Sequence, residues 1–299
     1  MIRLAIRVPR ESSELVLAEL LELTPAGVEE VQLDSEMVEY AIYGAPGELP
    51  GLPDLKVAAG GVLVDITTSE LADDWHERWK DFHRPVSIPA PDLSRGLAGT
   101  VPSLRVRPPW EPASPKSDSA VQEIVIDPGQ AFGTGGHAST RLCLELLLEL
   151  RAGESSASAL LDVGTGSGVL AIAAAKLGYG PLLGLDNELE SVQAALENAA
   201  ANDVELLTRR FDLRTEELPW QDGDPDAPSG QLLITANLLR PLLLELVGKL
   251  ERPPAHLIAG GLLTTELDEV AGTFIERLGM TERRRLNSGD WAAVWLSGA

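Results

Sequence analysis

The chain has 299 residues, of which 44% are hydrophobic and 23% charged, enough for one large domain or two ordinary ones around a substantial core. Its formal net charge of -22 disfavours broad nucleic-acid binding and would attract a lysine-rich partner, although acidity also simply maintains solubility. No apolar run reaches the ~18 residues of a membrane span, and the amino terminus lacks a signal-peptide pattern. One cysteine and four dispersed histidines exclude an internal disulfide and a ligand cluster. We expect a soluble, cytoplasmic monomer without a metal site.

The first part of the chain mixes strand and helix patterns. Alternating apolar residues predict strands, and an amphipathic run predicts one helix. The elements are a strand from Arg3 to Pro9, a helix from Glu14 to Leu23, strands over 27–33 and 37–43, a loop over 44–54 and a further strand over 61–67. This order predicts a small α+β domain of the ferredoxin-like kind over residues 1–68, which would recognise the substrate.

Residues 69–120 have the pattern of a linker. A charged helix over 71–82 would carry Trp75 and Trp79 one turn apart, on the same helical face. We interpret these tryptophans as filling a seam between domains; contact with a ligand or partner is the alternative. The proline-rich stretch that follows has one short predicted strand, near Leu104 to Val106.

Residues 121–299 are predicted to form a Rossmann-like α/β domain. From residue 159 onward strands and helices alternate, which predicts a parallel sheet covered on both faces. The last two strands predict an antiparallel hairpin at the edge of that sheet. The predicted strands are 121–126, 160–163, 181–185, 205–211, 231–235, 255–259, 280–286 and 291–296, and the helices begin near Thr140 and cover 169–177, 191–202, 239–250 and 264–278.

Two glycine-rich loops follow strands of this domain. The first runs from Asp127 to His137 and leads into the helix near Thr140; the second runs from Asp162 to Gly168. Glycines allow the backbone to approach a ligand closely, and ligands of doubly wound sheets bind beyond the carboxyl ends of the strands. The two loops therefore predict two walls of one ligand site.

The cofactor follows from the second loop. Gly164 and Gly166 would face a bulky ligand, and Asp186, which ends the next strand, can accept hydrogen bonds from a ribose diol. Because Val169 occupies the last position of the dinucleotide fingerprint, and Asp162 suits a cationic amino-acid tail, the pattern favours S-adenosylmethionine over NAD.

The segments DPGQAFGTGGHAST, LLDVGTGSGVLAIAAAKLG, GLDNELESVQAALENAAAN, TANLLRPLL and SGDW resemble the PrmA family of class I methyltransferases. These enzymes methylate the large-subunit ribosomal protein numbered eleven. The resemblance implies transfer of methyl groups to lysine side-chain or N-terminal amines. It covers the catalytic half of the chain, and more loosely extends back through WHERWKDFHRPVSI.

The resemblance implies cofactor contacts at Thr140, Gly164, Asp186 and Asn237, and a loop over the cofactor formed by Phe132, Gly133, Thr134, Gly135 and their neighbours up to His137. Asn237 would also position the amine, because its amide can donate and accept hydrogen bonds. Thr140 and Asn237 could instead serve only as helix caps. His137 is a candidate general base, but we expect it to shape the loop. Cys143 is expected in the core, which disfavours a cysteine-dependent base methylator.

The sequence departs from the family pattern in three places. Glu-Arg-Pro-Pro-Ala-His256 replaces a proline-glycine-glycine turn, Gly136 stands where a side chain is common, and the loop that begins at Asp222 is long and acidic. Three rival functions remain. A methyltransferase acting on glutamine or on base nitrogens would have an Asn-Pro-Pro-aromatic signature, whereas Asn237 is followed by Leu-Leu-Arg-Pro. The other two are a methyltransferase of the same fold that acts on a different protein and a non-catalytic adenosine-binding scaffold.

Overall fold

The fold was analysed in a computed structural model, which describes residues 2–13, 16–17, 20, 28–32, 37–44, 65–70, 83–91, 101–114, 120–128, 133–153, 159–219 and 232–298. Backbone contacts divide the chain into two compact units, Met1–Phe82 and His83–Ala299. The predicted helices over 14–23 and 71–82, with Trp75 and Trp79, and the loop at Asp222 lie outside the described residues or largely so. None of the described helices is long and apolar enough to cross a membrane.

The first unit contains an antiparallel sheet of four strands in the order β2-β3-β1-β4. The strands are β1 (Ile2–Pro9), β2 (Glu29–Gln32), β3 (Met37–Gly44) and β4 (Asp65–Glu70), with the short 3-10 helix η1 (Arg10–Ser12) after β1. Apolar side chains of β1 and β3, including Ile6 and Tyr40, are buried in its core. Strands were predicted close to β1, β2 and β3, whereas β4 overlaps the strand predicted over 61–67 only at residues 65–67. The ferredoxin-like assignment stays a prediction because it also depends on helices outside the described residues.

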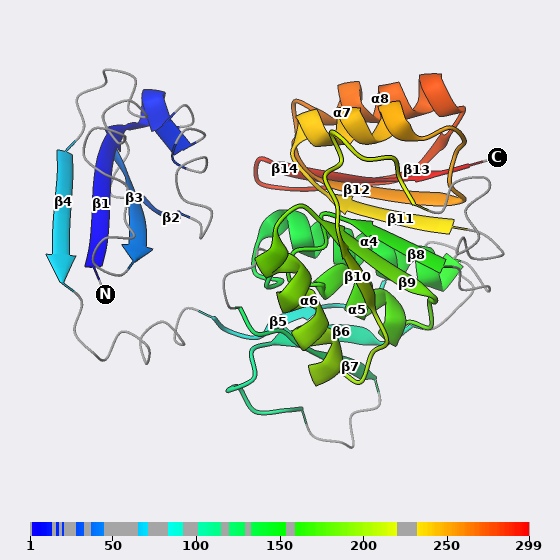
Figure 1. The fold of residues 1–299 in the computed structure, drawn as a ribbon, viewed down its shortest axis with the longest axis horizontal. Coiled ribbons are helices and arrows are strands. Elements are labelled where there is room, and N and C mark those ends of the chain that lie inside the picture. Colours follow the sequence, from blue (N-terminus) through cyan, green and yellow to red (C-terminus); the bar gives the residue numbers. More distant parts are fainter. Residues whose placement is uncertain are drawn as a thin grey trace. The chain divides into compact units, whose positions relative to one another are not determined.

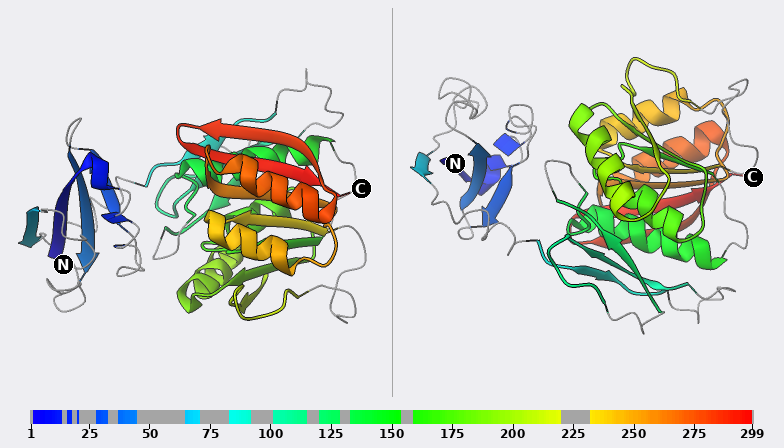
Figure 2. Two further views of the ribbon diagram at one scale, coloured as in Figure 1. Left: turned by 90° about the horizontal axis from the view of Figure 1, so that it is seen from above. Right: turned by 60° about the horizontal axis from the view of Figure 1, so that its bottom comes forward.

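The second unit is built on a sheet of seven strands in the order β10-β9-β8-β11-β12-β14-β13 (Figure 1). The strands are β8 (Ala159–Val163), β9 (Leu182–Asp186), β10 (Leu207–Arg210), β11 (Leu232–Asn237), β12 (His256–Leu263), β13 (Thr281–Ser288) and β14 (Trp291–Ser297). The first five in this order are parallel, and β14 and β13 add an antiparallel edge. The predicted sheet and terminal hairpin are confirmed, and Figure 2 shows the red hairpin at the sheet edge.

Helices cover both faces of this sheet. They are α4 (Ala138–Gly153), α5 (Val169–Lys176), α6 (Leu189–Ala201), α7 (Arg240–Lys249) and α8 (Leu267–Leu278). Successive residues of a buried strand point to opposite faces, so Leu160 packs with the core beside α4 and α5, and Leu161 with the core beside α7 and α8. Such two-sided burial explains the nearly continuous apolar runs of the parallel strands.

A further sheet of three strands, in the order β5-β6-β7, packs on the α4 and α5 layer (Figure 1). It consists of β5 (Val86–Ile88), β6 (Ser103–Arg107) and β7 (Val121–Val125), with β5 antiparallel and β7 parallel to β6. Leu104, Val106 and Ile124 are buried against the helices. The segment predicted as a linker over 69–120 thus contributes two strands to the second unit, where only one short strand was expected.

Candidate cofactor and methyl-transfer site

The second glycine loop lies at the carboxyl end of β8, where the sheet order changes direction between β8 and β11. Gly164, Gly166 and Gly168 all have positive φ angles, of 76°, 53° and 81°, which L side chains rarely adopt. A Cβ atom at Gly164 would also stand 2.3 Å from Cδ2 of Leu238, the residue after β11. Glycine is therefore required here both by the backbone conformation and by the close approach of the two loops.

Asp186 ends β9 as predicted, and its carboxylate faces the glycine loop. One oxygen accepts a hydrogen bond from the Gly166 N–H (2.9 Å) and the other from the Glu188 N–H (3.1 Å). Burial raises the pKa of Asp186, although these N–H groups oppose the rise. Each oxygen keeps lone pairs for further donors, so the carboxylate remains suited to a ribose diol.

Asp162, by contrast, lies entirely inside the domain. Its two oxygens accept hydrogen bonds from the hydroxyls of Thr165 (2.8 Å) and Thr235 (2.6 Å), which ties β8, β11 and the glycine loop together. Burial raises the pKa of Asp162 to about 6. These contacts give Asp162 a structural role in the loop, whereas the sequence pattern pointed to a contact with the cofactor.

Replacing Asp162 with asparagine tests this burial. Because the folded-state pKa of Asp162 is raised from 3.8 to about 6, the wild type binds an extra proton when folded and loses stability as pH rises through that window. The loss amounts to about 3 kcal/mol above it. Denaturant unfolding of both proteins at about pH 4 and about pH 7 should show Asp162→Asn gaining relative stability with pH. Parallel stability profiles of the two proteins would rule out the buried charge.

The first glycine loop contacts the second one. The Ser167 hydroxyl donates a hydrogen bond to the carbonyl of Gly133 (2.7 Å). Gly133 and Gly135 have φ angles of 100° and 85°, and a Cβ at Gly135 would press on Val106 of β6 at 3.1 Å. Thr134 lies half-buried between these glycines, and Phe132 lies outside the described residues. The two predicted walls are thus in direct contact at Ser167.

His137 immediately precedes α4. Its Nδ1 lies 2.8 Å from the Ser139 hydroxyl and 3.3 Å from the Ser139 N–H, as in a helix cap. Its ring packs edge-on against Trp291 of β14, with centroids 4.6 Å apart. Burial lowers the pKa of His137, so the imidazole is neutral at neutral pH. These contacts favour the loop-shaping role, and they bring in Trp291, which the sequence indicated only as part of the SGDW motif.

Asn237 and Thr140 meet at the carboxyl end of β11. The amide nitrogen of Asn237 donates a hydrogen bond to the hydroxyl of Thr140 (3.2 Å), which is fully buried in the first turn of α4. The amide oxygen of Asn237 is also buried, and no residue among those described donates to it. Cys143, one turn after Thr140, lies in the core, and burial raises the pKa of its thiol far above the usual range.

The structure therefore gathers the described candidates at one edge of the sheet. Gly164 follows β8 and Asn237 ends β11, on either side of the switch point, and Asp186 ends β9. Among the described residues, no three His, Cys, Asp or Glu side chains gather as a metal site would require. The sheet has the architecture of a class I methyltransferase. The features that define this class here are the glycine loop after β8, the carboxylate at the end of β9 and the asparagine at the end of β11. S-adenosylmethionine is the cofactor of this class.

Within that class, the chain belongs to the family described as ribosomal protein L11 methyltransferase (PrmA), whose model matches residues 54–297. A ribosomal protein L11 methyltransferase of Syntrophotalea carbinolica is 35% identical over 274 residues, covering 90% of this chain and 78% of that protein. One from Lactobacillus johnsonii is 34% identical over 285 residues, covering 94% and 80%. The crystal structure of ribosomal protein L11 methylase from Lactobacillus delbrueckii subsp. bulgaricus is 31% identical, with a TM-score of 0.53, covering 65% of this chain and 94% of that one.

Proposed function

We propose that this chain transfers methyl groups from S-adenosylmethionine to lysine side-chain and N-terminal amines of ribosomal protein L11. Two findings support this substrate: the family match, and the naming of ribosomal protein L11 as the substrate of relatives that align over most of the chain. The observation that carries the chemistry is the buried amide oxygen of Asn237, at the carboxyl end of β11 beside Gly260, which has no donor among the described residues. An amine N–H is a suitable donor for it.

When bound, the cofactor would supply a methyl group on positively charged sulfur. The amine lone pair would bond to the methyl carbon as the carbon–sulfur bond breaks, with its electron pair left on sulfur. The amine would then lose a proton. The chain must present that amine in its neutral form, although free lysine has a pKa of about 10.4. Partial desolvation at the site lowers the amine's pKa. Asn237 would then orient the nitrogen through its amide oxygen, and alignment with the methyl group supplies much of the rate.

The charge of the chain agrees with this partner. A formal net charge of -22 attracts a lysine-rich protein and repels phosphate backbones, so we propose that the enzyme contacts the protein rather than nucleic acid directly. We also propose that it acts in the cytoplasm and as a monomer.

Incubation of the purified protein with isotope-labelled S-adenosylmethionine and purified large ribosomal subunits tests the substrate. Mass spectrometry should locate the label on lysine and N-terminal amines of protein L11. The same reaction with free protein L11 shows whether the ribosome is needed. Label in ribosomal RNA or in another protein, with none in L11, would contradict the proposal.

A further inference from the structure

Two buried asparagines lie one turn apart at the end of helix α6: Asn198 in its last turn and Asn202 as its C-cap, with exposed fractions of 3% and 4%. Asparagine is a poor residue for the interior or last turn of a helix unless its amide has a partner elsewhere. The cofactor contacts proposed above do not explain why asparagines are buried at these two positions. Their amides form hydrogen bonds with β7 and with both glycine loops, and the Asn202 amide nitrogen also donates to the Asn198 carbonyl in α6 (2.7 Å).

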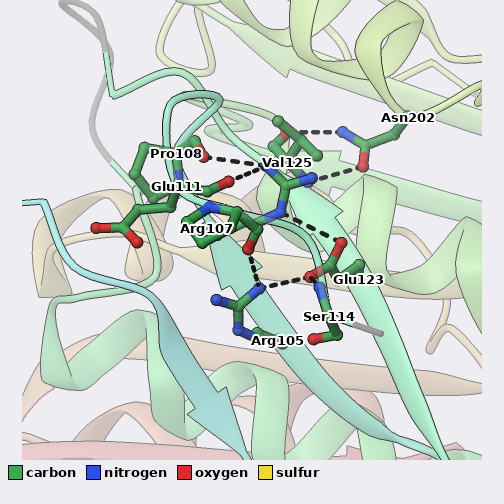
Figure 3. Close-up of polar contacts among 9 residues, drawn as sticks. Arg105, Arg107, Pro108, Glu111, Ser114, Glu123, Val125 and Asn202 are labelled. Carbon is green, nitrogen blue, oxygen red and sulfur yellow. Dashed lines mark hydrogen bonds and ion pairs between the residues drawn. The ribbon is translucent and has the colours of Figure 1, made fainter. Parts of the chain in front are cut away.

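Asn202 acts as a hydrogen-bonding partner for the edge of β7. Its amide oxygen accepts from the Val125 N–H (2.8 Å), and its amide nitrogen donates to the Val125 carbonyl (2.6 Å). Figure 3 shows this pair of bonds. The Asn202 carbonyl also accepts from the Lys176 ammonium at the end of α5 (2.6 Å). The end of β7 is thereby fixed to α6.

Asn198 continues the same arrangement one turn earlier in the helix, but connects different groups. Its amide oxygen accepts from the N–H of Asp127, the first residue of the first glycine loop (2.9 Å). Its amide nitrogen donates to the carbonyl of Ser167 in the second glycine loop (2.9 Å). The hydroxyl of the same Ser167 donates to the Gly133 carbonyl (2.7 Å). Gly133 is therefore held by Ser167 directly, and Asp127 is linked to Ser167 through Asn198.

The opposite side of β7 is also held. Glu123 lies between Arg105 and Arg107 of β6, forming ion pairs with both, and accepts a hydrogen bond from the Ser114 N–H (2.6 Å) (Figure 3). The Arg107 guanidinium in turn donates to the carbonyls of Pro108 and Glu111. A strand fixed from both sides is a rigid base for the loop that leaves it at Asp127.

We propose that Asn198 and Ser167 are positioning residues that hold Asp127 and Gly133 against the second glycine loop and thereby set the affinity for the cofactor. This inference rests on the proposed cofactor site. Neither side chain needs to touch the cofactor. The cost of ordering the first loop around a ligand is met in advance by bonds that exist in the free protein, which is how preorganisation raises affinity.

Two matched substitutions separate this role from plain stability. Asn198→Asp and Asn202→Asp each place a carboxylate of the same size at a buried position. Each keeps the oxygen that accepts from Asp127 or Val125 and loses the amide nitrogen, which donates once in Asn198 and twice in Asn202. Both variants should melt earlier, Asn202→Asp by at least as much as Asn198→Asp. Only Asn198→Asp places an oxygen against the Ser167 carbonyl. It should raise the Kd for S-adenosylmethionine about tenfold more than Asn202→Asp does, equivalent to about 1.4 kcal/mol.

Calorimetric titration at a temperature where both variants are folded gives the Kd values, and steady-state kinetics gives KM and kcat. The effect should appear in KM for the cofactor, with kcat at saturating cofactor retained, because Asn198 lies away from the reacting amine. Equal Kd values for the two variants would overturn the proposal. A wild type that binds no cofactor would instead overturn the cofactor site itself.

Ser167→Ala is a second test that buries no charge, and it serves if Asn198→Asp does not fold. It removes the hydroxyl bond to Gly133 and leaves the bond between Asn198 and the Ser167 carbonyl in place. We expect its Kd for S-adenosylmethionine to rise about fivefold, since a neutral hydrogen bond contributes about 1 kcal/mol. A wild-type Kd for Ser167→Ala would overturn the anchoring role of Ser167.

Discussion

Asp186→Ala should weaken the binding of S-adenosylmethionine about 100-fold, equivalent to about 3 kcal/mol. The variant removes a partly buried carboxylate that faces the glycine loop, where it would accept two hydrogen bonds from the cofactor ribose. Hydrogen bonds to a charged group contribute about 1.5–3 kcal/mol each. Calorimetric titration measures the Kd, and a thermal melt verifies that the variant is folded. If Asp186→Ala bound as tightly as the wild type, the ribose assignment would be wrong.

Asp186→Asn is the matched control, because it keeps the size of the side chain and one acceptor for the Gly166 N–H. We expect it to lose about tenfold in affinity, between the wild type and Asp186→Ala. The pH dependence has a definite sign. Burial raises the pKa of Asp186 in the free protein, and ribose hydroxyls favour its charged form. Cofactor affinity should therefore decline as pH falls through the raised pKa, and this decline should be absent in Asp186→Asn.

Asn237→Ala should lower kcat about 100-fold, because misplacing a reacting atom by about 1 Å costs on that order. Its amide oxygen has no donor among the described residues and can therefore accept a hydrogen bond from the incoming amine. The Kd for S-adenosylmethionine should change much less than kcat, since Gly164 and Asp186 remain in place. Single-turnover measurement of methyl transfer, with cofactor and substrate saturating, gives the rate. An unchanged rate would exclude Asn237 from amine positioning.

Two further variants resolve what the amide does. Thr140→Val removes the hydroxyl that receives the Asn237 amide nitrogen while keeping the shape of the side chain, so we expect an intermediate loss of rate. Asn237→Asp places a negative charge beside the amine, which stabilises the protonated form and raises the amine's pKa. Its pH–rate profile should shift to higher pH. A profile identical to that of the wild type would show that residue 237 does not face the amine.

The parallel sheet could be predicted because its signals are local. The run Leu160-Leu-Asp-Val, the alanine-rich segment after Val169 and the strand that ends at Asp186 each indicate their element within a few residues, and the sheet follows from their alternation. Gly164, Asp186 and Asn237 each lie at the carboxyl end of a predicted parallel strand, and such ends meet at one edge of a sheet. The predicted and observed boundaries of the elements differ by a few residues, because helix and strand ends fray.

The three-stranded sheet could not be predicted in the same way. β6 and β7 were predicted as strands, but β5 has only three residues and pairs with β6 across more than a dozen positions, so no local signal shows that the three strands form one sheet. Their burial depends on α4 and α5, which come later in the chain. The proline-rich sequence favoured a connector, and tertiary packing decided otherwise.

The candidate site shows the same division. Nothing local to Asp162 reveals that Thr235, 73 residues away, occupies one of its oxygens. Asn198 and Asn202 did carry a signal, since two asparagines one turn apart in an alanine-rich helix need partners. Those partners, Val125, Asp127 and Ser167, could only be identified once the helix and β7 were placed together.

A crystal structure of the protein with S-adenosylhomocysteine tests the account most directly. We expect the ribose hydroxyls within hydrogen-bond distance of the Asp186 carboxylate and the amino-acid end against the loop from Gly164 to Gly168. The sulfur should face the amide of Asn237. A ribose bound away from Asp186, or a sulfur facing away from Asn237, would contradict the assignment of this edge of the sheet as the methyl-transfer site.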